Sequence, residues 1–171
     1  MSDRYFAPTG GHPPQDQLLT DRAMFTEAYA VIPKGTMRDI VTSALPFWDK
    51  TRAWIIARPL SGFAETFSQY IMEVSPGGGS DRPETNPEAE AVLFVVSGEA
   101  ELTLGAATQP LVPGSYVYLP AGQDWSFRNA GSAPVVFHWI RKAYEAVDGI
   151  DAPEPFVVNE ADVVPNPMPG T

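Results

Sequence analysis

Residues 114–129, in the second half of the chain, contain turn-forming residues at short intervals. Only short strands fit between them. Five residues separate Gly114 from Pro120, one separates Pro120 from Gly122, and six separate Gly122 from Asn129. The residues between Gly114 and Pro120 are almost all aromatic or aliphatic, a composition typical of a strand. Glycine and proline at the ends favour tight corners. The segment therefore predicts a strand, a corner and a second strand.

The rest of the chain adds further strand patterns and no persuasive helical period. Strands are expected at residues 25–32, 37–45, 51–57, 63–74, 91–96, 99–104, 109–112 and 135–140. The first two are expected to form a hairpin around a turn at 33–35. A chain of 171 residues buries one substantial core, and its 18 prolines and 14 glycines suit many short strands. The sequence thus predicts an all-β fold with one main domain.

The strand at 91–96 is apolar on both of its faces. Residues 75–89, rich in proline, glycine and acid, are expected to form a flexible loop that leads into this strand and its closing Gly98. Because side chains alternate across a sheet, Ala91, Leu93 and Val95 share one face, and the intervening residues share the other. A face left in water normally carries polar residues. We therefore expect the outer face to be covered by an N-terminal strand, a second domain or another subunit.

The segments 77–98 and 114–129 together resemble the paired motifs of the cupins, which are small antiparallel β-barrels of the jelly-roll kind. The motif and turn positions of that resemblance are Gly98, Gly114, Pro120, Gly122 and Asn129. The resemblance implies a cupin-type jelly-roll barrel at 23–144, with the hairpin at its start. An extended N-terminal arm at 1–22 precedes it. A proline- and acid-rich segment at 145–171 follows as a linker toward a second cupin that this sequence lacks, with one short strand expected at 156–158.

The residues that cupins use to bind a metal are replaced here. Trp125 stands at the histidine of the second motif, Ala91 stands at the glutamate of the first, and residues 84–87 contain no histidine where the first motif has two. Alternation turns Phe127 inward beside Trp125. Metal ions in proteins are held by imidazole, carboxylate or thiolate groups, and an interior of this kind offers none. We predict that this segment holds no metal and no catalytic residue.

A barrel without a metal could still bind a small molecule in an apolar pocket with a few polar anchors. The candidate pocket residues are Trp125, Phe127, Tyr70 and Arg82. Arg82 is the only positive charge in the loop at 75–89, and either it or Glu84 is a candidate for the pocket mouth. The other interpretation of this loop is a solvated surface segment.

Neither histidine is predicted to bind a metal. His12 lies in the N-terminal arm and is expected to be a solvated surface residue. His138 shares a strand face with Val136 and Ile140. That setting favours a hydrogen-bonded histidine in the core or in an interface.

Charge and cysteine content exclude several classes of function. The 11 basic and 21 acidic residues give a net charge of −10, which disfavours nucleic acid and anionic membranes as partners. The absence of cysteine removes disulfides and thiolate chemistry, and a reducing cytoplasm is the expected location. No segment has the roughly 20 apolar residues of a membrane span, and the N-terminus has no apolar run of the signal-peptide type.

Six further stretches are similar to the N-terminal half of the two-cupin (S)-ureidoglycine aminohydrolases of purine and allantoin breakdown. They are residues 18–23, 30–35, 51–56, 69–71, 77–79 and 91–98. In that family the first cupin lacks metal ligands, while the second holds manganese and hydrolyses ureidoglycine to ureidoglycolate and ammonia. The resemblance implies a non-catalytic half that acts as scaffold and oligomerisation surface for a metal-bearing cupin. It also implies a homo-oligomer, with a small-molecule substrate for the full-length enzyme.

Two other functions remain open at this point. One is a stand-alone, metal-free cupin that binds a small apolar or aromatic metabolite. The other is a metal-dependent dioxygenase or isomerase of the cupin type, which would require a bound iron or manganese ion. Cupin barrels support many chemistries, so the fold alone does not choose among them.

Overall fold

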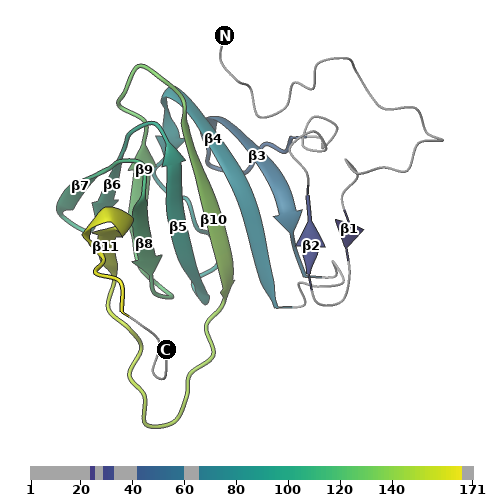
Figure 1. Ribbon diagram of the computed structural model, residues 1–171, viewed down its shortest axis with the longest axis vertical. Coiled ribbons are helices and arrows are strands. Elements are labelled where there is room, and N and C mark those ends of the chain that lie inside the picture. The colour runs from purple at the N-terminus through teal and green to yellow at the C-terminus, as the bar shows by residue number, and fades with distance from the viewer. Residues whose placement is uncertain (1–23, 26–28, 33–41, 60–65, 167–171) are drawn as a thin grey trace.

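The computed structural model describes residues 24–25, 29–32, 42–59 and 66–166 (Figure 1). Within these residues, eleven strands and one short 3-10 helix follow one another. They are β1 (Met24–Phe25), β2 (Ala30–Val31), β3 (Asp49–Ala57), β4 (Phe67–Ser80), β5 (Ala89–Ser97), β6 (Ala100–Leu104), β7 (Ala107–Leu111), β8 (Ser115–Leu119), β9 (Trp125–Arg128), β10 (Val135–Ala143), β11 (Phe156–Asn159) and η2 (Glu160–Asp162). No helix in these residues is long and apolar enough to cross a membrane. The predicted all-β fold is confirmed.

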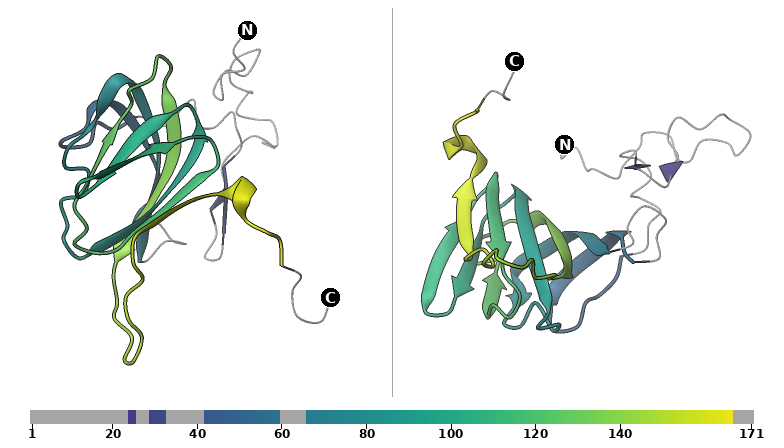
Figure 2. Two further views of the ribbon diagram at one scale, coloured as in Figure 1. Left: turned by 90° about the vertical axis from the view of Figure 1, so that its left-hand side faces the viewer. Right: turned by 90° about the horizontal axis from the view of Figure 1, so that it is seen from below.

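Nine of the strands form one antiparallel sheet in the order β11-β8-β5-β10-β4-β9-β6-β7, with β3 paired to β4. The sheet is strongly curled, so that β9, β6 and β7 curve back across the face of β5 and β10 (Figure 2). The long strand β4 makes this possible. It pairs with β10 over its first part and with β9 at Gly79 and Ser80. One strand therefore carries the chain from one side of the barrel to the other.

The core lies inside the curl, on the face that alternation predicts. Ala91, Leu93 and Val95 of β5 are buried, and so are Trp125 and Phe127 of β9. The other buried hydrophobic residues of this main cluster are Trp48, Ala53, Met72, Val74, Ala100, Leu102, Leu111, Val117, Leu119, Val135, Phe137 and Trp139. The predicted inward faces of both motifs are confirmed, because the period-two pattern fixes which side chains leave water.

The three glycines at 77–79 belong to a strand, so the prediction of a flexible loop over all of 75–89 is wrong at its start. Their lack of side chains lets β4 approach β9 closely: a Cβ atom on Gly79 would lie 2.0 Å from the carbonyl oxygen of Phe127. Gly79 also has a φ of 142°, which side-chain-bearing residues rarely adopt. These glycines therefore continue the ladder across the corner of the barrel, and the loop proper begins at Asp81.

The expected N-terminal hairpin is also corrected. Met24 pairs with Val31 and Phe25 with Ala30, so residues 25–32 cannot form one continuous strand and instead form a small pair of their own. The expected turn at 33–35 and most of the strand at 37–45 lie outside the described residues. The short strand expected at 156–158 is confirmed as β11, which pairs with β8 at the edge of the main sheet.

We predict that Gly79→Ala destabilises the fold much more than Gly105→Ala does. Both glycines have positive φ, but a Cβ on Gly105 meets nothing within 4 Å. In the Gly105 variant the free energy of unfolding should fall by about 1 kcal/mol, the cost of a side chain at positive φ. In the Gly79 variant the overlap with the backbone should raise this loss to about 2–4 kcal/mol. Urea unfolding of the two variants measures the difference. Equal losses would show that the β4–β9 contact does not need the glycine.

Candidate functional site

An aromatic cluster closes the interior of the barrel. Trp48, which precedes β3, packs against Trp125, Phe127, Phe137 and Trp139 with ring centroids 5.8 to 6.4 Å apart. Its indole Nε1 donates to the carbonyl of Pro83 at 3.4 Å, which joins this cluster to the loop after β4. The cluster buries large rings in edge and tilted contacts that stabilise a core.

The sequence pattern did not identify Trp48 as a core residue. The preceding Phe47 has a φ of 65°, and this uncommon backbone conformation turns the chain so that Trp48 enters the barrel while Phe47 stays exposed. The aromatic pair Phe47-Trp48 directly before a strand was the only signal available in the sequence. A local pattern does not indicate which of two neighbouring rings is buried.

Arg141, another residue that sequence analysis missed, occupies the space beside Ala91. The β5–β10 register pairs Arg141 with Ala91, and alternation puts both on the inward face. The guanidinium of Arg141 lies 5.4 Å from the ring centroid of Trp139, and its Nη2 atom lies 2.6 Å from Oε1 of Glu84. A small residue at 91 leaves room for this arrangement. Beside Ala91, which stands at the glutamate of the first cupin motif, this chain therefore has an ion pair between Arg141 and Glu84.

Glu84 holds the wall of the barrel mouth in place. Its Oε1 accepts hydrogen bonds from the backbone N–H groups of Thr85 and Asn86, at 2.9 and 2.8 Å, in addition to the bond from Arg141. The side chain is 10% exposed, and the side chain of Arg141 is 25% exposed. Ion pairs with this degree of burial resist screening by salt better than surface pairs do. The loop at 81–88 is thus fixed to β10 by charge and to Trp48 by a hydrogen bond.

A cavity of about 660 Å³ opens at this mouth. Its apolar floor and walls include Ala91, Leu119 and Trp125, and its rim comes from the loop at 81–87 and from the corner at 120–124. The volume lies within the usual range of small-molecule pockets. The structure therefore contains a concave site at the end of the barrel where Trp125 and Ala91 replace the metal ligands of other cupins.

The four candidate pocket residues are divided between the cavity and the core. Trp125 and Arg82 line the cavity. Phe127 is fully buried behind it, and Tyr70 packs on Trp139 with ring centroids 5.5 Å apart. Ligand binding by this set stays a prediction, with only the first two positioned to touch a bound molecule.

Of the five motif positions, Pro120 and Gly122 line the cavity, while Gly98, Gly114 and Asn129 lie at the opposite ends of β5, β8 and β9. Gly98, Gly114 and Gly122 all have positive φ at turns. Asn129 is buried and makes three bonds: its Nδ2 donates to the carbonyls of Val74 and Ala133, both at 2.8 Å, and its Oδ1 accepts from Gly131. A side chain amide that satisfies three backbone groups fixes the loop after β9 against β4.

The residues at the mouth do not fit a metal ion. No group of three or more histidine, cysteine, aspartate or glutamate side chains that could hold one is found in the described part of the chain. The donor set argues the same way, because the carboxylate of Glu84, which is 10% exposed, is already paired with Arg141. A cation placed there would face the guanidinium at short range, an unfavourable contact in a poorly solvated site.

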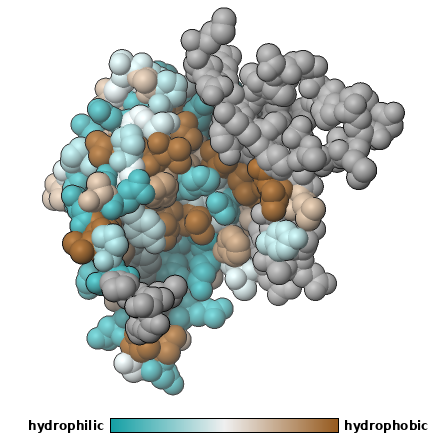
Figure 3. Space-filling view, viewed as in Figure 1, coloured by the Kyte–Doolittle hydropathy of each residue, from teal (hydrophilic) through white to brown (hydrophobic). Residues whose placement is uncertain are grey.

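The outer face of the sheet is also rich in apolar groups. In the register, Phe94 of β5 lies between Tyr116 of β8 and His138 of β10, and Val92 lies between Tyr118 and Ile140. Figure 3 shows hydrophobic surface, in brown, over these central strands. Exposed large hydrophobic residues on this face are Val96, Tyr116, Ile140, Phe156 and Val158. The outward-facing residues of these strands are called the outer apolar face below: Val92, Phe94, Val96, Tyr116, Tyr118, Val136, His138, Ile140, Phe156 and Val158.

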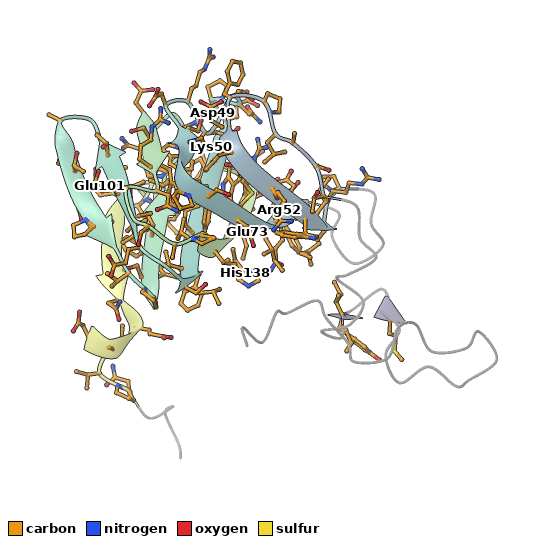
Figure 4. All side chains as sticks on the ribbon, turned by 90° about the horizontal axis from the view of Figure 1, so that it is seen from above. Asp49, Lys50, Arg52, Glu73, Glu101 and His138 are labelled. Carbon is orange, nitrogen blue, oxygen red and sulfur yellow. The ribbon has the colours of Figure 1, made fainter. Side chains whose placement is uncertain are left out.

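Polar groups on and beside this face are paired. His138 is half-buried, burial lowers its pKa, and its Nδ1 lies 3.2 Å from Nε2 of Gln69, as expected for a hydrogen-bonded histidine. Figure 4 shows His138 apart from Arg52 and Glu73, which point toward each other from β3 and β4. Burial, followed by the hydrogen bond and charge of Glu90, raises the pKa of Tyr118 to about 12. The face is therefore neutral at its centre.

We predict that Arg141→Met destabilises the protein by about 2–3 kcal/mol, because it leaves the buried carboxylate of Glu84 without its counter-ion. Lys142→Met is the matched control, since Lys142 is more exposed and lies 3.9 Å from Glu90. An exposed pair of that kind contributes about 0–1 kcal/mol. Denaturant unfolding gives both values. A loss at Arg141 no larger than at Lys142 would contradict a structural role for the inner pair.

Comparison with known proteins agrees with this geometry. Residues 70–141 match a family model described as Cupin domain. Over 137 residues the chain is 26% identical to (S)-ureidoglycine aminohydrolase of Escherichia coli, a match that covers 79% of this chain and 50% of that protein.

Two solved structures are similar over most of the chain. A protein of Pseudomonas aeruginosa described as glyoxylate-induced has 62% sequence identity and a TM-score of 0.80, covering 98% of this chain and 60% of that one. Protein Ylba of Escherichia coli has 25% identity and a TM-score of 0.75, covering 86% of this chain and 59% of that one. The chain thus spans half to three-fifths of the length of these relatives. These matches support a cupin of the family that includes (S)-ureidoglycine aminohydrolase.

Proposed function

We propose that this chain is the N-terminal, non-catalytic cupin half of a (S)-ureidoglycine aminohydrolase. In this role it is a scaffold and oligomerisation surface for a metal-bearing cupin, which hydrolyses ureidoglycine to ureidoglycolate and ammonia with manganese in allantoin breakdown. Residues 145–171 are the linker toward that second cupin. The complete enzyme is a cytoplasmic homo-oligomer with two cupins per chain.

The observation that carries this proposal is the Glu84–Arg141 pair beside Ala91, the residue that stands at the glutamate of the first cupin motif. Activating a water molecule with a metal requires a vacant coordination position and several ligands. A neutralised ion pair above three packed tryptophans supplies neither. The outer apolar face supports the second part of the proposal, because contiguous exposed hydrophobic surface of this kind is typical of interaction sites.

The proposal predicts that the 171-residue protein releases no ammonia from (S)-ureidoglycine, with or without added manganese. A chain that continues into a metal-bearing cupin should be active under the same conditions. A coupled ammonia assay compares the two, and manganese content is measured on both samples. Full activity of the shorter protein would refute the scaffold role, and stoichiometric metal in it would favour the dioxygenase or isomerase alternative.

The proposal also predicts that the outer apolar face mediates assembly. Val96→Lys and Ile140→Lys place a charge on this face without disturbing the core, since both side chains are already exposed. Each should shift the protein from oligomer to monomer, because an interface core does not tolerate an unpaired charge. Light scattering after size exclusion measures the mass. The matched control is Val112→Lys, at an exposed valine outside this face. The interface would be contradicted if the wild-type protein were a monomer, or if Val112→Lys caused the same loss of mass.

A second candidate function is a stand-alone module that binds a small apolar or aromatic metabolite. The observation that favours it is the cavity of about 660 Å³ with Trp125 and Leu119 in its lining. Contact with a ligand should change tryptophan fluorescence, and Trp125→Phe should remove that change while leaving the signals of Trp48, Trp54 and Trp139. A metabolite panel that produces no such change would argue against this function.

A further inference from the structure

The charges around the cavity mouth are not equivalent, because most of them are already paired inside the protein. Asp81 pairs with Arg128 at 2.7 Å, and Glu84 pairs with Arg141 at 2.6 Å. Neither arginine partner lines the cavity. These two carboxylates are therefore neutralised from outside the site and add little to its field.

Arg82 and Asp124 are the charged lining residues that stay available. Arg82 is the one basic side chain among the lining residues, and no described residue forms an ion pair with it, although acids lie on both sides of it in the sequence. Its guanidinium lies 5.6 Å from the ring centroid of Phe47, a contact that positions it without occupying its N–H donors. No described residue pairs with the carboxylate of Asp124.

Arg82 and Asp124 come from different loops and line the same cavity as Ala91, Leu119 and Trp125. Arg82 lies in the loop between β4 and β5, and Asp124 in the corner between β8 and β9, directly before Trp125. Ala91 and Leu119 complete the floor. The site thus presents a donor fork, an acceptor and an apolar surface within one cavity.

We propose that the cavity binds a small zwitterion of the amino-acid type. Its carboxylate pairs with the guanidinium of Arg82, its ammonium group with the carboxylate of Asp124, and its side chain lies on the indole of Trp125. An arginine fork matches a carboxylate in two parallel hydrogen bonds. A simple anion would be repelled by Asp124 and by the net charge of −10, and a simple cation by Arg82. A zwitterion is neutral overall and satisfies both charges.

This inference deepens the second candidate function by naming its ligand class, and it is independent of the scaffold role. Isothermal titration calorimetry with L-leucine and L-phenylalanine tests it. Isocaproate, which lacks the amino group of leucine, and isoamylamine, which lacks its carboxylate, are the matched controls. The expected result is binding of the amino acids and binding at least about tenfold weaker for both single-charge analogues, a loss of about 1.4 kcal/mol or more.

Substitutions test whether binding depends on these two charges or on the charge of the protein surface in general. Arg82→Gln and Asp124→Asn should each weaken binding at least about tenfold, by removing one charge-assisted contact. Arg58→Gln and Asp148→Asn, at exposed positions outside the cavity, should leave it unchanged. All four positions are exposed, so the variants should fold normally, which circular dichroism checks. The inference is overturned if neither amino acid binds, or if binding is unchanged in both cavity variants. If uncharged phenol binds and the amino acids do not, the inference is overturned and the binding of apolar ligands is retained.

Discussion

The contact between an arginine and the ring of a tryptophan inside the barrel is the interaction on which the rest of this structure depends. Arg141 covers Trp139, and Trp139 in turn packs on Trp48, Trp125 and Tyr70. A partly buried guanidinium is stabilised by a counter-ion, and Glu84 provides it. The loop that carries Glu84 is thereby fixed across the mouth. Core packing, charge neutralisation and the shape of the cavity are parts of one arrangement.

This arrangement depends on small residues as much as on large ones. Ala91 leaves space for Arg141 within the β5–β10 pair, and Gly79 lets β4 pass against β9 at the corner of the barrel. A larger side chain at either position would force the neighbouring strand or side chain to move, because protein interiors are already close-packed. The glutamate that cupins carry at the position of Ala91 would compete with Glu84 for the same guanidinium. The replacement of metal ligands is therefore a coordinated change of several residues.

The inner and outer faces of the sheet serve different purposes in the proposed function. The inner face is packed with buried side chains and has a cavity of about 660 Å³ at its mouth. The outer apolar face has exposed hydrophobic residues on four neighbouring strands and a half-buried, hydrogen-bonded His138 near its centre. A metal-binding barrel could use the same outer face while working on its inner face. A cupin whose inner face offers no metal ligands can thus still contribute surface to a larger assembly.

The sequence by itself determined the all-β class, the corners at Gly98, Gly114 and Gly122, the inward faces of β5 and β9, and the replacement of metal ligands by Ala91 and Trp125. Those features follow from local rules: turn chemistry and the two-residue period of a strand act between neighbours in the chain. The tertiary structure alone decided that Trp48 enters the barrel, that Arg141 pairs with Glu84, and that Gly79 belongs to a strand. These contacts join residues at least 35 positions apart in the chain, and no local pattern specifies which distant partners a curled sheet brings together.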